Sequence, residues 1–290
     1  MPNVSYWLES AAWFLGFMGV FWILSRRFAA ADRGPLLPKG AISADMAYWF
    51  VFPLLYGLMQ TAWLNLGLGA LFGGDQDKIL TFFATGVPAL RALPLWLQAL
   101  LVLLISDVML YWSHRWFHKG RLWRFHAIHH APKQVDWLTC VRFHPLNVAF
   151  YTTLVNALVI MMGFSPQTLV FLAPFNIIWS ALVHANLNWD FGPFRMWIAS
   201  PVFHRWHHSD QPEAIDKNFA ATFPFIDWLF GTLYFPKGEQ PKSFGTPHDP
   251  VPENLLGQMV YPFAPSWFEK PKSAAPHTGL SPVMKKEVSS

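Results

Sequence analysis

Four long apolar stretches constrain the fold of this chain more than any other feature of its sequence. They run from residue 6 to 25, from 46 to 72, from 94 to 113 and from 145 to 183. A helix needs roughly 20 mostly apolar residues to cross the hydrocarbon core of a bilayer. Charged residues make up only 13% of the chain, against about 25% in soluble domains. The sequence therefore predicts an all-α integral membrane protein.

Details within these stretches refine the expected helices. The basic pair Arg26 and Arg27 follows the first stretch instead of preceding it, which favours a membrane span over the alternative of a signal peptide. Pro53 is expected to kink or tilt the second helix. In the fourth stretch, Gly163–Pro166 has the sequence "GFSP" and predicts the turn of a helical hairpin. Each arm has about 17 residues, or roughly 26 Å, so the hairpin either crosses the membrane twice or dips partway into it.

Basic residues alternate between the loops and predict an orientation, because cytoplasmic loops are enriched in Lys and Arg. The loop 26–39 and the segment 114–144 are basic, whereas the two basic residues of the loop 73–93 are offset by two aspartates. We expect a small transmembrane bundle of about three spans plus the hairpin, with a histidine-rich helical cap in the cytoplasm. Such a multi-pass protein belongs in a bacterial inner membrane, or in the endoplasmic reticulum of a eukaryote. Loops facing anionic lipid explain the net charge of +4 without a nucleic-acid partner.

Histidines are concentrated on that predicted cytoplasmic side. Ten of the twelve lie between His114 and His208, mostly in the clusters "HRWFH", "HAIHH" and "HRWHH". Their offsets of three and four residues place the rings of each cluster on one helical face. Protonated imidazoles so close together would repel each other. The clusters therefore predict neutral histidines that share a metal.

The number of ligands indicates which metal. Three clusters supply eight imidazoles, and a single zinc takes about four protein ligands or fewer. Magnesium and calcium prefer oxygen, and the lone Cys140 excludes a thiolate-rich site. We therefore expect a dinuclear iron centre. Dinuclear zinc is the main alternative, and copper is less favoured.

Polar residues near the clusters are further candidates. Asp107 and Tyr111 continue the helical face of the first cluster, and a buried acid in an apolar stretch needs a partner. We expect a histidine N–H to be that partner, with a helix–helix hydrogen bond as the alternative. His184 ends the hairpin and is a candidate ninth ligand, and Asn188 follows it at helical spacing, contributing directly or through water. His144 either bonds to backbone at the start of a helix or lies beside the substrate.

These features together resemble a known family. The order of the three clusters, the apolar hairpin before the third, and the words "RFHPLN", "HANLNW" and "DKNFAATFPFIDWLFGTLYFP" are similar to the fatty acid hydroxylase and sterol desaturase superfamily of membrane di-iron oxygenases. The likeness runs from about residue 106 to 236. It implies one membrane-embedded hydroxylase domain over residues 1–270, whereas the composition of residues 271–290 is typical of a disordered tail.

The resemblance also implies a set of ligands. Carried over by position, they are His114, His118, His126, His129, His130, His184, His204, His207 and His208. Some members of the family have a further histidine where this chain has Asn188, so one coordination position is open, filled by water or filled by substrate. Asn218 and Asp227 match the family pattern as residues that hold the ligands in place, with capping or turn roles as the alternative.

The implied chemistry is oxidation of a lipid. Two iron ions per chain with O2 as co-substrate would hydroxylate an unactivated C–H bond of a membrane lipid, such as a fatty acyl chain, a sterol or a carotenoid. No catalytic residue is expected apart from the metal ligands, and zinc is an expected substitute in purified protein. A desaturase that introduces a C=C bond is the alternative. A membrane zinc hydrolase, a haem-binding electron-transfer subunit and a metal transporter are more remote.

Electrons for this reaction must come from elsewhere. The sequence has no flavin fingerprint, no haem-attachment motif and no cysteine set for an iron–sulfur cluster. We therefore expect a separate electron carrier and reductase. The basic residues Arg115, Lys119, Arg121 and Arg124 are candidates for docking an acidic carrier.

Overall fold

A computed structural model of the chain describes residues 4–30, 42–85 and 87–264. The predicted tail 271–290 lies outside these residues, as do Arg33, Lys39 and His277. The predicted single domain over residues 1–270 stays a prediction.

The described residues form helices and loops without a β-strand, which confirms the all-α fold. The longer helices are α1 (Val4–Phe28), α2 (Ile42–Phe50), α3 (Phe52–Phe72), α4 (Gln76–Thr85), α6 (Leu95–Phe117), α8 (Pro145–Met161) and α9 (Pro166–His184). The short α-helices are α5 (Pro88–Arg91), α7 (Trp123–His130), α10 (Pro201–His207), α11 (Phe225–Leu229) and α12 (Leu255–Val260). The 3-10 helices are η1 (Gly120–Leu122), η2 (Trp137–Val141), η3 (Gly192–Phe194), η4 (Pro212–Ala214) and η5 (Tyr261–Phe263).

Three helices of the described part of the chain are long and apolar enough to cross a membrane. They are Val4–Phe28, Leu95–Phe117 and Gln167–His184. The protein is therefore an integral membrane protein, as predicted. The predicted second span is divided between α2 and α3, which are separated at Val51. Pro53 in the first turn of α3 explains the break, because its ring clashes with the preceding turn and it has no N–H to donate.

The apolar stretch 145–183 forms the predicted helical hairpin. Helix α8 has 17 residues and α9 has 19, and a short turn over residues 162–165 joins them. At the rise of an α-helix these arms are about 26 and 28 Å long. Helix α9 runs back to the histidine-rich end of the protein, where it finishes at His184.

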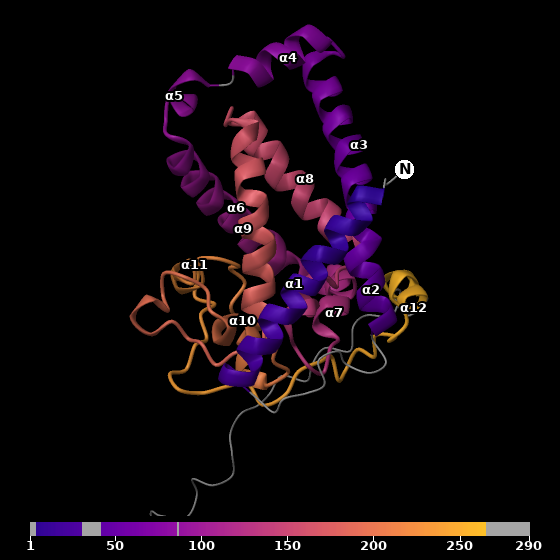
Figure 1. The fold of residues 1–290 in the computed structure, drawn as a ribbon, viewed down its shortest axis with the longest axis vertical. Coiled ribbons are helices and arrows are strands. Elements are labelled where there is room, and N and C mark those ends of the chain that lie inside the picture. The colour runs from indigo at the N-terminus through magenta and orange to yellow at the C-terminus, as the bar shows by residue number, and fades with distance from the viewer. Residues whose placement is uncertain (1–3, 31–41, 86, 265–290) are drawn as a thin grey trace, which may run out of the picture.

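The helices gather the functional segments at one end of the molecule (Figure 1). Helices α4 and α5 lie at one extreme, and α7, α10, α11 and α12 lie with long loops at the other. Aromatic side chains of α1 pack there against α2 and η2, with Phe14 and Phe17 contacting Trp49 and Trp137. Each aromatic pair contributes about 0.5–1.5 kcal/mol beyond the burial of its apolar surface. Because Ala181 of α9 belongs to the same cluster, this packing also holds η2 beside α9.

The hairpin turn requires a glycine and provides a test of this fold. Gly163 has φ +76°, and a Cβ there would lie 2.6 Å from the backbone nitrogen of Val87. Gly163→Ala should therefore lower thermal stability in detergent by more than the roughly 1–2 kcal/mol that a left-handed backbone costs an alanine. Gly74→Ala is the control, because Gly74 has φ +77° and no atom near the added Cβ. Equal losses of stability in the two variants would contradict the packing at Gly163.

Candidate metal centre

Nine buried or partly buried histidines form two adjacent groups at the end of the helices. The five-histidine group contains His114, His118, His126, His130 and His207, and the four-histidine group contains His129, His184, His204 and His208. Within each group the candidate ligand nitrogens lie within 4.8 Å of one another. The groups adjoin, because the His130 ring stacks on His208 with ring centroids 4.5 Å apart. All nine histidines singled out from the sequence are thus brought together.

Four helices deliver these side chains, each near its end. His114 lies in the last turn of α6 and His118 caps it, while α9 stops at His184. Helix α7 is only eight residues long and α10 only seven. Helix α10 starts sharply because the Ser200 hydroxyl accepts the backbone N–H of Phe203 and Pro201 follows the cap. Short helices can present several ligands to one point without extending past it.

Hydrogen bonds at Nδ1 fix the tautomer of most of these rings. His114 Nδ1 lies 2.8 Å from the carbonyl of Phe219, and His207 Nδ1 lies 2.7 Å from the carbonyl of Lys217. Two more rings also meet carbonyls: His184 Nδ1 lies 2.6 Å from that of Ser180, and His129 Nδ1 lies 3.2 Å from that of Arg142. The other two meet side-chain oxygens: His126 Nδ1 lies 2.9 Å from Asn147 Oδ1, and His118 Nδ1 lies 3.2 Å from Asp216 Oδ1. Because these oxygens only accept, Nδ1 carries the proton. The lone pair of each neutral ring therefore lies on Nε2.

The Nε2 atoms point toward one another, which is unfavourable without a cation. His114 and His126 approach to 2.9 Å between their Nε2 atoms, and His129 and His184 to 3.2 Å. Neither atom of these pairs has a proton to donate if both Nδ1 atoms carry theirs. The buried Nε2 atoms of His118 and His207 have no hydrogen-bond partner among the described residues. Inward lone pairs, all on nitrogen, fit two metal ions of the transition series.

Burial keeps the rings neutral and able to bind metal. For the histidines outside the spanning helices, burial is the largest cause lowering the pKa well below its usual value near 6.5, and neighbouring rings add to it. These residues are His118, His126, His129, His130, His204, His207 and His208. A neutral imidazole is the form that coordinates a metal.

Comparisons with known proteins agree with this geometry. Residues 99–232 match the model of the family described as fatty acid hydroxylase. The predicted resemblance to this family is therefore confirmed over these residues. The matched region begins in α6 and ends just after α11, so it contains all nine histidines of the two groups. No solved structure matches the chain.

Curated proteins that match this part of the chain carry several names. The chain is 28% identical over 172 residues to ornithine lipid hydroxylase OlsE of Rhizobium tropici, covering 59% of this chain and 52% of that protein. It is 29% identical over 171 residues to alkylglycerol monooxygenase of Caenorhabditis elegans, covering 57% and 32% respectively. With methylsterol monooxygenase 2-2 of Arabidopsis thaliana the identity is 28% over 160 residues, covering 52% and 59%. The chain thus matches about half of the length of the first of these relatives.

Two buried carboxylates hold the loop beside the five-histidine group. Asp107 accepts the backbone N–H groups of Ala221, Thr222 and Phe223 at 2.7–3.1 Å. Asp227 accepts those of Phe219 and Ala220 at 2.7 and 2.8 Å. The expectation of a histidine partner for Asp107 is therefore wrong. Its partners are backbone amides of a loop that is 114 to 116 residues away in the sequence.

Asn218 and Tyr111 strengthen the same loop. Asn218 has φ +58°, and its side-chain nitrogen donates to the carbonyls of Phe203 and Tyr234. The Tyr111 hydroxyl lies 2.9 Å from Thr232 Oγ1, and its buried ring packs edge-on against Phe219. Both residues belong to the packing that surrounds the loop and lie outside the two groups of ring nitrogens.

Two other candidates lie in positions that their sequence context did not settle. His144 bonds to backbone at the start of α8, where its Nδ1 accepts Leu146 N–H and its Nε2 lies 3.3 Å from the Met259 carbonyl. The helical spacing assumed between His184 and Asn188 is wrong, because α9 ends at His184 and Ala185 is extended with ψ 145°. Asn188 is exposed, and its backbone N–H donates to the Phe28 carbonyl.

Sequence reasoning missed several residues that hold ligands. Asn147 accepts from His126, and the Arg142 carbonyl accepts from His129. Asp45 of α2 binds the Arg142 guanidinium through Nε at 2.8 Å. Asn147 and Arg142 lie in the word "RFHPLN" that carried part of the family resemblance, so that word was the available signal. No sequence signal pointed to Asp45, which is 97 residues away from Arg142.

The roles of His144 and Asn188 can be tested against those of the grouped histidines. His144→Ala should lower the free energy of unfolding by about 1 kcal/mol, because it removes two partly buried hydrogen bonds to backbone, and should leave the metal content unchanged. Asn188→Ala should change neither quantity. Metal analysis and thermal unfolding of the purified variants measure both. Loss of metal in either variant would make that residue part of the centre.

Proposed function

We propose that the protein is an O2-dependent di-iron oxygenase that hydroxylates an unactivated C–H bond of a membrane lipid. The observation that carries this proposal is the pair of adjacent histidine groups with neutral, inward-facing nitrogens at the ends of membrane helices α6 and α9. The match of residues 99–232 to the fatty acid hydroxylase family supports it.

The nine histidines would hold one iron in each group. The five imidazoles of one group are more than the four ligands or fewer that zinc usually takes from a protein, whereas six-coordinate iron can accept both sets and keep a position for another ligand. Iron bound in both groups would supply the redox chemistry for O2-dependent hydroxylation of a C–H bond. Zinc in place of iron in purified protein would reflect the general affinity of imidazole for zinc.

The chain itself holds and shields this centre. Backbone carbonyls retain the Nδ1 protons of His114, His184 and His207, so each ring keeps its orientation. Phe143 stacks on the ring of His129 with centroids 3.8 Å apart, and such apolar contacts exclude water. No side chain is required as a separate acid or base, so the residues of the reaction are the ligands and the groups that fix them.

A membrane lipid is the substrate class that fits the surroundings. His114 and His118 lie at the end of the apolar helix α6, and His184 lies at the end of the apolar helix α9. A substrate dissolved in the bilayer could therefore approach them without crossing water. The relatives named above are an ornithine lipid hydroxylase, an alkylglycerol monooxygenase and a methylsterol monooxygenase. Each of these names refers to a lipid, but the three lipids differ in chemical type.

Metal and lipid analysis together test this function. Protein purified in mild detergent should contain two iron ions per chain, and lipid extracts from expressing cells should contain a species heavier by one oxygen atom. His129→Ala should lower the iron content and abolish that species. His248→Ala is the matched control, because His248 is exposed and lies outside both groups. Loss of two hydrogens would indicate a desaturase, two zinc ions without oxidation a hydrolase, and one haem an electron-transfer subunit.

The histidine-bearing end would face the cytoplasm and receive electrons there from a separate carrier and reductase. It carries the basic segment 114–144, in which Lys119 and Arg121 are exposed next to the metal ligand His118. Arg115 and Arg124 instead pack over the rings of Trp112 and Tyr261. Exposed charges of one sign mainly speed the association with an oppositely charged partner.

Charge reversal at Lys119 and Arg121 tests this docking surface. The double variant K119E/R121E should reduce turnover at limiting carrier concentration by about 10-fold at low salt, because the basic field no longer steers an acidic carrier. The loss should shrink as ionic strength rises. Lys78→Glu on α4, at the opposite end of the molecule, is the control. Unchanged turnover in the double variant would exclude this surface.

A further inference from the structure

We propose that the two metal sites are held by separate supports, one built on a carboxylate-clamped loop and the other on a buried ion pair, so that each site can be weakened alone. This inference rests on the proposed function only in assigning one metal ion to each histidine group. It identifies Asp107 and Asp227 as positioning residues for the five-histidine site and Asp45 as a positioning residue for the four-histidine site.

The first support is the loop of residues 216–223, here called the clamp loop. It accepts the Nδ1 protons of His118 through the Asp216 carboxylate, of His207 through the Lys217 carbonyl and of His114 through the Phe219 carbonyl. All of these rings belong to the five-histidine group. Among the described hydrogen bonds, the clamp loop receives no ring proton from the four-histidine group.

Two carboxylates determine the position of the clamp loop. Its five consecutive backbone N–H groups from Phe219 to Phe223 all donate to Asp227 or Asp107. Both acids are buried, at 0% and 3% exposure respectively, so the hydrogen bonds have no competition from water. Asp107 comes from the spanning helix α6 and Asp227 from α11. The loop is therefore fixed to the same helix that carries His114.

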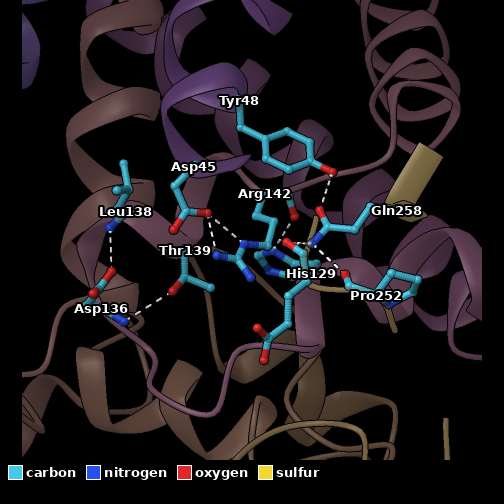
Figure 2. Close-up of polar contacts among 10 residues, drawn as sticks. Asp45, Tyr48, His129, Asp136, Leu138, Thr139, Arg142, Pro252 and Gln258 are labelled. Atoms are coloured by element: carbon cyan, nitrogen blue, oxygen red, sulfur yellow. Dashed lines mark hydrogen bonds and ion pairs between the residues drawn. The ribbon is translucent and has the colours of Figure 1, made fainter. Parts of the chain in front are cut away.

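The second support holds the four-histidine group from the opposite side. His129 donates to the carbonyl of Arg142, and the guanidinium of Arg142 binds Asp45 of α2 (Figure 2). In this view Arg142 lies between the Asp45 carboxylate and the His129 ring. Arg142 and Asp45 are both buried, at 6% and 4% exposure. Such a pair is strongly destabilised when one partner is removed, because the other charge is left uncompensated.

Neighbouring contacts make this second support rigid. The η2 helix that leads into Arg142 is closed by a capping box, in which Asp136 accepts Leu138 N–H and Thr139 Oγ1 accepts Asp136 N–H. Arg142 N–H in turn donates to the Thr139 carbonyl at 3.1 Å. The same figure shows Tyr48 one turn after Asp45, bonded to Gln258 of α12. The carbonyl that binds His129 is thus held by α2 and η2, without contact to the clamp loop through a described hydrogen bond.

Substituting the carboxylates with amides separates the two supports. Both oxygens of Asp227 accept loop amides, so an asparagine presents an N–H₂ group where one amide needs an acceptor. At Asp45 the same change removes the charge that compensates the buried Arg142 guanidinium. Loss of residues that orient metal ligands commonly weakens metal binding by about 10–100-fold. Asp227→Asn should therefore weaken one site at least about 10-fold and leave the second unchanged. Asp45→Asn should do the same to the other site.

The experiment titrates metal-free protein in detergent with Co²⁺ and follows the visible absorption of the bound ion against a competing chelator. Wild type should bind two Co²⁺ ions tightly, and each of the two variants should bind one. Adding His208→Ala to Asp227→Asn should remove tight binding altogether, because both groups are then disturbed. Adding His118→Ala to Asp227→Asn should remove no further tight site. With Asp45→Asn the two histidine variants exchange roles. Adding His118→Ala should remove tight binding altogether, and adding His208→Ala should remove no further tight site.

Controls keep the outcome specific. Asp75→Asn makes the same chemical change at an exposed residue between α3 and α4 and should retain two tight sites. If Asp227→Asn does not fold, Thr232→Val removes a hydroxyl that donates to Asp227 Oδ1 at 2.7 Å and should weaken the same site to a smaller degree. If the wild type binds two ions, equal weakening of both sites in a variant, or of neither site, would overturn the separate supports and leave the proposed function standing. A wild type that binds fewer than two ions would overturn the dinuclear centre itself.

Discussion

The hydrogen bonds from imidazole Nδ1 to protein oxygen atoms are the interactions on which the centre depends. An imidazole can rotate and exchange tautomers, and neither freedom is compatible with a preformed metal site. An acceptor behind each ring removes both, because the proton stays on Nδ1 and the lone pair stays on Nε2. Six of the nine rings have such an acceptor. The remaining rings are those of His130 on α7, His204 on α10 and His208, which caps α10, and the other histidines of these two helices are fixed in this way.

Burying so many imidazoles has a cost that the fold must offset. Lone pairs that face each other in a water-free space repel, and protonation, which would relieve the repulsion, is prevented by burial. The packing around the centre resists its expansion. Aromatic rings of α1, α2 and η2 press on one side, and the clamp loop with Phe219 closes another. The structure therefore holds the ligands close together, which favours metal ions over the empty protein.

The sequence revealed the parts of this structure that depend on local pattern. Apolar length predicted the helices at 4–28 and 95–117, and histidine spacing predicted that each cluster presents its rings on one face, because both are properties of a single helix. The number of imidazoles then predicted that the three clusters would converge on a shared centre. Sequence reasoning failed where helix periodicity was extended too far, as at Asn188 beyond the end of α9. It also failed where the partner is backbone. The carbonyl that holds His114 is 105 residues away in the sequence. Every residue type has a backbone carbonyl, so nothing in the sequence marks this one as the partner.

The clamp loop has a consequence for how this protein can vary. Its contacts to Asp107, Asp227, His114 and His207 run through backbone N–H and C=O groups, which every residue except proline possesses in full. Many side chains along "FAATF" could therefore change without breaking a single one of these contacts. Inserting or deleting one residue would instead shift every amide past its carboxylate and move the Phe219 carbonyl away from His114. In this segment it is the length of the chain, more than its chemistry, that would encode the proposed metal site.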